Sequence, residues 1–310
     1  MRFSDGLGYA GWPVMTLPAT EGVLLVAHGT VTELDDLVPF LTAIRRGRPP
    51  SESLVEEIRR RYELIGGSPL LTTTRQQAEA LATLVHKPVF VGMRFGRPSI
   101  EQALGDAWEQ GVRGLTVLPM APYSVQLYSD EVSVRQRAMQ GQPGEEIRLT
   151  RVAAWGSHPG LVNAHVENIR ERAGDQLLRG ASLVLSAHSL PMRVIEAGDN
   201  YAREVESSKE AIARAIGLDI ELGFQSQGAD GGRWLGPDLN DVVSSLASRG
   251  KRQIVVAPFG FLCDHVETLY DLDVELRRHT DALGVTFDRV PALGVHPGLM
   301  TTLGELVGSA

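Results

Sequence analysis

The sequence predicts an α/β protein made of two similar domains, each a four-stranded parallel sheet flanked by helices. A strand-to-turn motif occurs twice, as GVLLVAHGT at 22–30 and ASLVLSAHSL at 181–190. A second motif, His-Pro-Gly-Leu, also occurs twice, at 158–161 and 296–299, in the same order within each half. An apolar run that ends in a polar residue is typical of a buried parallel strand. The repeats therefore indicate two similar halves that face each other across a cleft.

Apolar runs alternate with longer amphipathic segments along the chain, which is the pattern of Rossmann-like domains. Strands are expected at 23–27, 88–91, 115–119 and 149–154 in the first half, and at 183–187, 220–224, 253–258 and 285–290 in the second. Helices are expected at 51–65, 76–85, 100–109, 201–216, 238–248 and 299–307. No GxGxxG follows a predicted strand and no GxxxxGK[ST] occurs, so the usual nucleotide-binding fingerprints are missing.

The 310 residues divide more naturally into two units than one, because single hydrophobic cores stop growing at about 250 to 300 residues. We expect a Gly- and Pro-rich leader at 1–21, disordered and of unassigned role, an N-terminal domain at 22–155 and a C-terminal domain at 156–296. The last helix, 297–310, is expected to pack back on the N-terminal domain. His158 and His296 are expected to cap helices, because the proline that follows each favours a first helical turn.

Composition narrows the class of protein and its compartment. The formal net charge of -8 argues against a nucleic-acid partner, which would require a basic face to meet phosphates. The chain has one cysteine, Cys263, which cannot form an internal disulfide or hold a [2Fe-2S] cluster, so a reducing compartment is expected. No apolar stretch is long enough to span a bilayer, and the segment 1–21 lacks the pattern of a signal peptide. We therefore expect a cytoplasmic protein without an integral membrane segment.

Two histidines are expected at the ends of matched strands. His28 closes the first copy of the repeated motif and His188 closes the second. Open α/β sheets bind ligands at the carboxyl ends of their strands, and a neutral imidazole can ligate a transition metal or accept a proton near neutral pH. The alternative is that each ring only hydrogen-bonds its own turn. Their matched positions favour a shared functional cleft.

Three carboxylates follow the strand expected at 253–258. Glu267, Asp271 and Glu275 are spaced by four residues in DHVETLYDLDVE, which would place them along one stripe of a helix. Such a stripe is commonly a solvated face. Like charges at this spacing also repel one another unless a cation offsets them, and a hydrated metal ion or a proton relay would do so. Asp264 and His265 are expected to cap this helix and hold its turn.

The chain resembles the ferrochelatases, enzymes that insert ferrous iron into a porphyrin, from about residue 22 to the C-terminus. The matching segments are IRRGRPP (44–50), RRYELIGGSPL (60–70), 74–81 with QQAEAL, SAHSLP (186–191), GDNY (198–201), FQSQG (224–228), WLGP (234–237) and DHVETLYDLDVE (264–275). The resemblance implies a chelatase-like fold, with His188 and Glu267 as catalytic residues that also contact the metal. Asp271 and Glu275 would be outer residues that pass metal ions inward or carry protons away. A base near the macrocycle helps because the entering metal displaces two pyrrole protons.

Three segments, IRRGRPP, SAHSLP and SVQLY (124–128), are most similar to the coproporphyrin III ferrochelatases of the Gram-positive type, whose substrate is a tetracarboxylate. Protoporphyrin IX is the alternative substrate. Guanidinium groups pair bidentately with carboxylates. Contacts to the propionates are expected from Arg45, Arg46, Arg61, Ser68 and Tyr128.

His28 departs from this resemblance. Coproporphyrin-type enzymes have an AYGT turn where this chain has AHGT, and their tyrosine is placed as an axial ligand to product iron. We expect His28 to take that place, in contact with both substrate and iron. The AHG turn is also similar to that of small cobalt chelatases, so a sirohydrochlorin cobalt or iron chelatase is a further alternative.

The remaining expectations concern ligands and partners. Ferrous iron is expected as substrate, with no tightly bound cofactor, no [2Fe-2S] cluster and a Mg²⁺ ion at the outer acidic site. A monomer is expected, in transient contact with neighbouring heme-pathway enzymes. The rival from another class is a tetrapyrrole-binding protein without catalysis. The joint presence of His188 and Glu267 favours an enzyme, because a carrier needs an axial ligand but no base.

Overall fold

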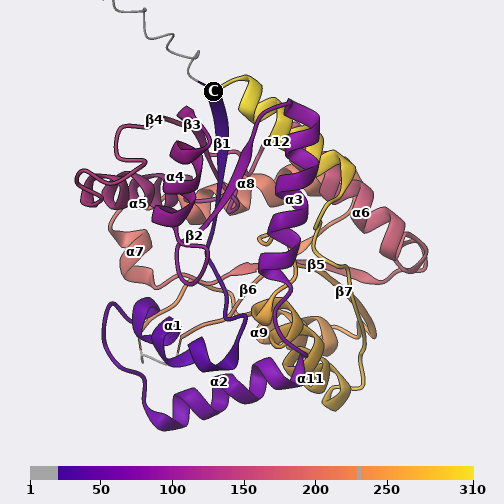
Figure 1. Ribbon diagram of the computed structural model, residues 1–310. Coiled ribbons are helices and arrows are strands. Elements are labelled where there is room, and N and C mark those ends of the chain that lie inside the picture. The colour runs from indigo at the N-terminus through magenta and orange to yellow at the C-terminus, as the bar shows by residue number, and fades with distance from the viewer. Residues whose placement is uncertain (1–19, 229–231) are drawn as a thin grey trace, which may run out of the picture.

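The computed structural model describes residues 20–228 and 232–310, and it contains two four-stranded parallel sheets flanked by helices (Figure 1). The predicted α/β class and both parallel sheets are confirmed. Residues 1–19 of the predicted leader lie outside the described residues. Thr20 and Glu21, which we had assigned to the leader, begin the first strand.

The two sheets have the same strand order. The first contains β1 (Thr20–Ala27), β2 (Val89–Met93), β3 (Val112–Pro119) and β4 (Arg148–Arg151) in the order β2-β1-β3-β4. The second contains β5 (Ser182–His188), β6 (Glu221–Gln225), β7 (Gln253–Ala257) and β8 (Thr286–Arg289) in the order β6-β5-β7-β8. All neighbouring strands pair in parallel. The duplicated sequence motif therefore corresponds to a duplicated topology.

Helices cover both faces of each sheet, and the pattern of apolar residues predicted most of the longer ones. The predicted set comprises α2 (Glu52–Leu64), α3 (Leu70–Val85), α4 (Ile100–Glu109), α8 (Tyr201–Ile216), α9 (Leu239–Ser248) and α12 (Pro297–Gly308). No residue range was predicted for α1 (Leu37–Ile44), α5 (Val125–Ala138), α6 (Pro159–Leu178), α7 (Met192–Glu196) and α11 (Arg277–Ala282), although the cap expected at His158 did predict the start of α6. The His-Pro-Gly caps are confirmed, because His158 Nδ1 accepts from Gly160 N and His296 Nδ1 accepts from Gly298 N, both at 3.2 Å.

Alternate residues of the central strands enter different cores. In the first half, Leu24 and Val26 pack with α4 and α5, whereas Val23 and Leu25 pack with α3, α6 and α12. In the second half, Leu183 and Leu185 pack with α6 and α8, and the opposite face packs with α9. The central strands β1 and β5 are mainly apolar because both faces of each sheet are buried.

Helix α6 contacts the cores of both halves. Leu161 and Ala164 belong to the core around β1, while Val166 and Ile169 belong to the core around β5. A helix buried on two sides has no single apolar stripe, which explains why the apolar pattern did not predict the extent of α6, although the His158 cap predicted its start. The helix α12 packs against both α3 and α6. The division into domains at 155 and 156 stays a prediction.

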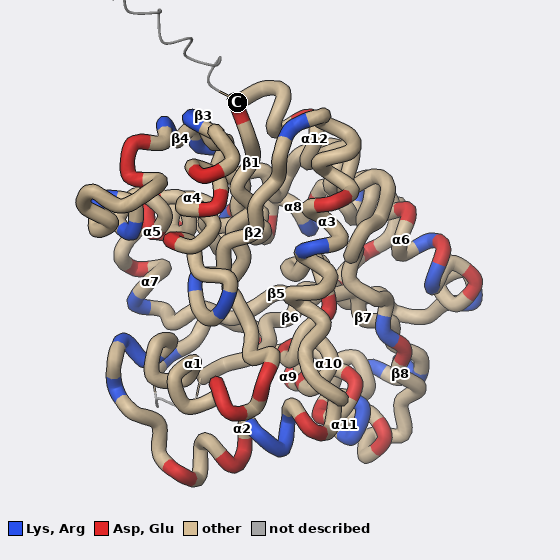
Figure 2. The backbone as a smooth tube through the Cα atoms, in the orientation of Figure 1, with Lys and Arg blue, Asp and Glu red and all other residues tan. Residues whose placement is uncertain are grey.

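Charged residues lie mainly on the helices and connecting turns, and the central strands carry few of them (Figure 2). Within residues 20–228 and 232–310, no helix combines the length and the apolar character that crossing a membrane requires.

Candidate active site

A cavity of about 480 Å³ is lined by residues from the carboxyl ends of the central strands in both halves. The direction in which strands are added reverses between β1 and β3 in the first sheet, and between β5 and β7 in the second. Such switch points leave a crevice beyond the strand ends. Here the two crevices share one cavity, with His28 after β1 and His188 at the end of β5 on its wall.

The tip of β1 is held against the turn after β2. Gly29 has a φ of 103°, and a side chain there would lie 1.7 Å from the Phe95 carbonyl oxygen, so only glycine fits. Phe95 N also donates to the His28 carbonyl oxygen at 2.9 Å. These contacts explain why a glycine follows the histidine, and they fix the direction of the His28 side chain.

His28 presents a neutral imidazole to the cavity. Its Nδ1 lies 3.4 Å from Tyr128 Oη, and its ring meets the Phe95 ring edge-on at 5.1 Å. Desolvation by the surrounding walls lowers the pKa of His28 to about 4, while Glu267 opposes that shift. The ring remains accessible through the cavity, so water that enters reduces the shift. A neutral ring keeps the lone pair that metal ligation requires.

His188 and Glu267 form an ion pair across the other side of the cavity. His188 Nδ1 lies 3.0 Å from Glu267 Oε2, and each side chain is about one-third exposed, 34% and 33%. Burial favours neutral forms of both groups, yet the Glu267 carboxylate raises the pKa of His188, and His188 helps hold the pKa of Glu267 well below its usual value. The charged pair is therefore the favoured state near neutral pH.

Hydrogen bonds to the main chain position this pair. Tyr201 Oη donates to the His188 carbonyl oxygen at 2.7 Å, and Gln225 Nε2 donates to the Glu267 carbonyl oxygen at 2.7 Å. Tyr201 begins α8 and Gln225 ends β6, so elements on two sides support the His188–Glu267 pair.

His265 lies beside the pair and was interpreted from the sequence only as a cap. The capping role is confirmed, because His265 N donates to Thr268 Oγ1 at 3.0 Å. Its ring also lies 4.9 Å from the Phe261 ring, and its Nε2 is 3.7 Å from Glu267 Oε2. Glu267 therefore faces two imidazoles, a role for His265 that sequence reasoning missed.

Several enclosed polar atoms on the cavity wall lack a hydrogen-bond partner among the described residues. They include Gln77 Oε1, Arg94 Nε, Tyr123 Oη and His265 Nδ1. Buried polar atoms are paired in the great majority of cases. Their concentration here indicates that a polar ligand or water completes the site. Arg94 directly follows β2, so the signal that identified His28, a polar residue at a strand end, would also have identified Arg94.

The structure brings half of the predicted site residues to the cavity. His28, Arg46, Tyr128, His188 and Glu267 line it. The predicted residues that do not line it are Arg45, Arg61, Ser68, Asp271 and Glu275.

Arg61 instead supplies the cation that offsets the acidic residues. Its Nη1 lies 3.7 Å from Asp271 Oδ1, its Nη2 lies 3.9 Å from Glu275 Oε1, and its guanidinium stacks over the Tyr270 ring at 4.6 Å. We expected a metal ion or a proton relay to offset the repulsion between these carboxylates. In the structure, the guanidinium of Arg61 does so. Burial, with the nearby Glu267 charge, raises the pKa of Asp271 to about 7, although Ser226 Oγ donates a hydrogen bond to it.

The carboxylates also do not lie along one regular α-helix. The short helix α10 (Val266–Leu269) is followed by the π-helix η2 (Asp271–Leu276), in which Glu275 N donates to the Tyr270 carbonyl oxygen at 3.0 Å. This wider turn changes the angular spacing that the four-residue pattern implied. Among the residues that the structure describes, no group of three or more His, Cys, Asp and Glu is arranged to hold a metal ion.

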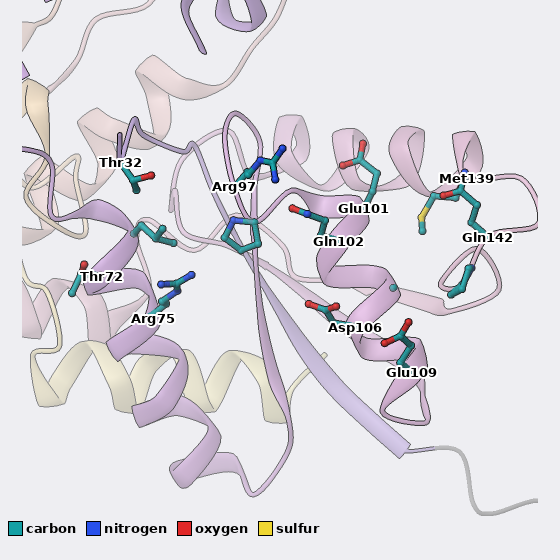
Figure 3. Close-up of a pocket in the computed structure, with 14 residues that line it drawn as sticks. Thr32, Thr72, Arg75, Arg97, Glu101, Gln102, Asp106, Glu109, Met139 and Gln142 are labelled. Carbon is teal, nitrogen blue, oxygen red and sulfur yellow. The ribbon is translucent and has the colours of Figure 1, made fainter. Parts of the chain in front are cut away.

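A separate hollow of about 780 Å³ lies beside α3 and α4 (Figure 3), and neither His188 nor Glu267 lines it. Arg75 and Arg97 share it with Glu101, Asp106 and Glu109. None of the predicted site residues lines this hollow, and its mixed charge favours neither an anionic nor a cationic ligand.

Comparisons with known proteins identify the family of the chain. The family model described as Ferrochelatase matches residues 20–310. A coproporphyrin III ferrochelatase of Anoxybacillus flavithermus is 34% identical over 92% of this chain and 95% of its own length. A ferrochelatase of Thermus thermophilus is 34% identical over 93% and 98%, and a coproporphyrin III ferrochelatase of Bacillus subtilis is 31% identical over 92% and 96%.

The solved structures add evidence on the fold. The cobalt complex of a sirohydrochlorin chelatase from Bacillus subtilis subspecies spizizenii aligns with a TM-score of 0.58 at 15% identity, covering 94% of both chains. At that identity, the likeness concerns the fold alone. The family match over all the described residues, with 34% identity to two relatives across more than nine-tenths of the chain, shows that this protein belongs to the ferrochelatase family.

Proposed function

We propose that this protein inserts ferrous iron into coproporphyrin III, with the macrocycle held between His28 and the His188–Glu267 pair. The observation that carries the proposal is the 3.0 Å ion pair on one side of the cavity, facing a neutral imidazole from the other half. A tetrapyrrole carrier needs only one axial ligand. Here the side of the cavity opposite His28 also has His188 and Glu267, with Asp271 behind them.

The charges of the site match the proton balance of the reaction. Insertion of Fe²⁺ releases two protons from the pyrrole nitrogens, and the product is neutral at its centre. In its charged state the His188–Glu267 pair already holds one proton, on His188. The pair therefore cannot keep both pyrrole protons and must pass protons on. Asp271, with its pKa of about 7 and its charge coupled to Glu267, accepts a proton and passes it outward at neutral pH. Imidazole and carboxylate ligands also replace water on the incoming ion.

The favoured substrate follows from the basic residues at the cavity and from the names of the relatives. Arg46 and Arg94 both line the cavity, and a guanidinium binds a carboxylate through two parallel hydrogen bonds. Several of the relatives are named coproporphyrin III ferrochelatases. Arg45, Arg61 and Ser68 stay predicted propionate contacts, although Arg61 is already paired with carboxylates.

Two alternatives remain for the substrate and the metal. Protoporphyrin IX is the second porphyrin candidate, since the reaction at the macrocycle centre is the same. Sirohydrochlorin with cobalt or iron is the third, and His28 specifically favours it, because an imidazole replaces the expected tyrosine in the turn after β1.

The proposal includes the finer expectations about ions and cellular context. A Mg²⁺ ion is placed at Asp271 and Glu275, where Arg61 already offsets part of the negative charge and favours weak, exchangeable binding. The protein is expected to be a cytoplasmic monomer that contacts neighbouring heme-pathway enzymes transiently, without a [2Fe-2S] cluster.

A panel of substrates tests the proposal. Purified protein would be mixed anaerobically with Fe²⁺ or Co²⁺ and with coproporphyrin III, protoporphyrin IX or sirohydrochlorin, and the loss of free-base absorption bands would be followed. The highest kcat/KM is expected for Fe²⁺ with coproporphyrin III. Turnover of sirohydrochlorin alone would contradict the proposal, and so would tight tetrapyrrole binding without any turnover.

A further inference from the structure

A second hollow of about 650 Å³ adjoins the active-site cavity on the side of the first half. The two spaces share three lining residues and are therefore immediate neighbours. We call the second space the arginine annex. It shares His28, Arg46 and Arg94 with the cavity and continues to Phe95, Glu131 and Arg135.

Arg135 is fully engaged within the protein. Its Nε donates to Glu131 Oε1 at 2.8 Å, and its Nη2 donates to the Arg94 carbonyl oxygen at 2.7 Å. Arg135 therefore neutralises Glu131 and holds the main chain at the end of β2. The other two guanidinium groups that line the annex belong to Arg46 and Arg94.

Arg94 is held in place without using its Nε donor. Its side chain is 20% exposed, and its Nε lies 3.8 Å from Glu131 Oε2, beyond hydrogen-bond distance. The guanidinium instead stacks over the Phe95 ring at 5.1 Å and the Tyr128 ring at 5.8 Å. The enclosed Nε has no hydrogen-bond partner among the described residues. Aromatic contacts thus orient a partly exposed guanidinium that makes no hydrogen bond among the described residues.

Arg46 supplies a second cation at the rim. It follows α1 with a φ of 56°, a left-handed conformation that is uncommon for a residue with a side chain. Its side chain makes no hydrogen bond or ion pair within residues 20–228 and 232–310. Arg46 and Arg94 therefore approach one space from different elements, and neither has a carboxylate within hydrogen-bond distance.

We infer that the arginine annex binds one carboxylate side arm of the substrate and that Arg94 determines specificity for it. An apolar group at this position would leave the partly enclosed guanidinium of Arg94 without a carboxylate partner, and sites built to pair a polar group reject analogues that lack it. The annex therefore favours a tetracarboxylate over a dicarboxylate with an apolar substituent in the same place. This inference rests on the proposed function, because it assumes that a tetrapyrrole occupies the cavity.

Two measurements test the inference, with Arg94→Ala, Arg94→Lys and a matched control, Arg97→Ala. Arg97 lies close by in the sequence and lines the separate hollow over α3 and α4. The first measurement is porphyrin binding without metal, by quenching of porphyrin fluorescence, with coproporphyrin III and protoporphyrin IX. The second is kcat/KM for iron insertion into each porphyrin. Circular dichroism and thermal unfolding confirm that each variant folds.

Arg94→Ala is expected to weaken coproporphyrin III binding by about 10- to 100-fold, the usual effect of losing a charge-assisted hydrogen bond, and protoporphyrin IX binding by less than about threefold. Arg94→Lys should recover part of the loss, because a lysine keeps the charge but not the planar fork. Arg97→Ala should match the wild type. Equal losses for both porphyrins, or no loss for either, would overturn the inference. If the wild type bound porphyrin without inserting iron, the proposed function would be refuted. The binding measurements on the Arg94 variants would still test whether the annex holds a carboxylate.

Discussion

Glu267→Gln should change the protonation of His188 and the rate of insertion much more than the binding of porphyrin. The substitution preserves the size of the side chain and removes its charge. In the wild type, the carboxylate at 3.0 Å raises the pKa of His188 against the effect of burial. Without the carboxylate, burial remains the main influence, so the pKa of His188 should fall below its ordinary value of about 6.5.

The distance sets the size of this change. Two unit charges 3.0 Å apart interact by about 1.4 kcal/mol even at the dielectric constant of water. That energy corresponds to about one pKa unit, and it is a lower estimate because both side chains are two-thirds enclosed. Loss of a positioned acid or base typically lowers a rate by about 10²- to 10⁴-fold. Insertion should fall within that range while porphyrin affinity changes less than about threefold.

Nuclear magnetic resonance titration of the histidine ring protons measures the pKa of His188, with His188→Ala to assign its signal. Insertion rates and fluorescence-based binding would be measured on the same samples. Glu210→Gln is the control, because Glu210 lies on α8 outside the cavity and its side chain is 57% exposed. An unchanged pKa of His188 in Glu267→Gln would refute the reasoning. Parallel losses of insertion and binding would instead make Glu267 a binding residue.

Three further predictions concern the proton path, the axial ligand and the junction between the halves. Because the pKa of Asp271 is about 7, insertion should slow as the pH falls through 7 and this residue becomes protonated, and Asp271→Asn should remove that limb from the pH–rate profile. His28→Ala should alter the absorption spectrum of the bound iron product by removing its axial ligand, and an unchanged spectrum would place that ligand elsewhere. Gly156→Ala should destabilise the protein by about 1 to 3 kcal/mol in urea unfolding, since the added carbon would lie 2.1 Å from a Tyr123 ring atom. Gly174→Ala, a helical position with no neighbour within 4 Å, should be neutral or stabilising.

The central strands and their functional ends could be predicted because local sequence determines them. The run before His28 is apolar from Val23 to Ala27, and only Ser186 interrupts the apolar run before His188, which is the pattern of parallel strands buried on both faces. A polar residue directly after such a run must lie at the edge of the sheet. The same reasoning predicted the cavity from two histidines that stand in different halves of the sequence.

The pairing of charged side chains could not be predicted, because it depends on distant partners. Arg61 and Arg94 are both arginines at the ends of regular elements in the first half. The first is paired with Asp271 and Glu275, which belong to the other half of the chain, and the second keeps its Nε unpaired among the described residues. Nothing near either residue distinguishes them. The π-helix η2 also escaped prediction, since the four-residue spacing of its carboxylates is typical of an ordinary helix.

The amount of product formed per protein molecule tests the central claim most directly. Wild-type protein would be incubated anaerobically with excess Fe²⁺ and excess coproporphyrin III, and the iron product would be quantified over time. We predict many product molecules per protein molecule, with turnover nearly abolished in Glu267→Gln. Product that stops at one molecule per protein molecule would contradict catalysis and identify a tetrapyrrole-binding protein.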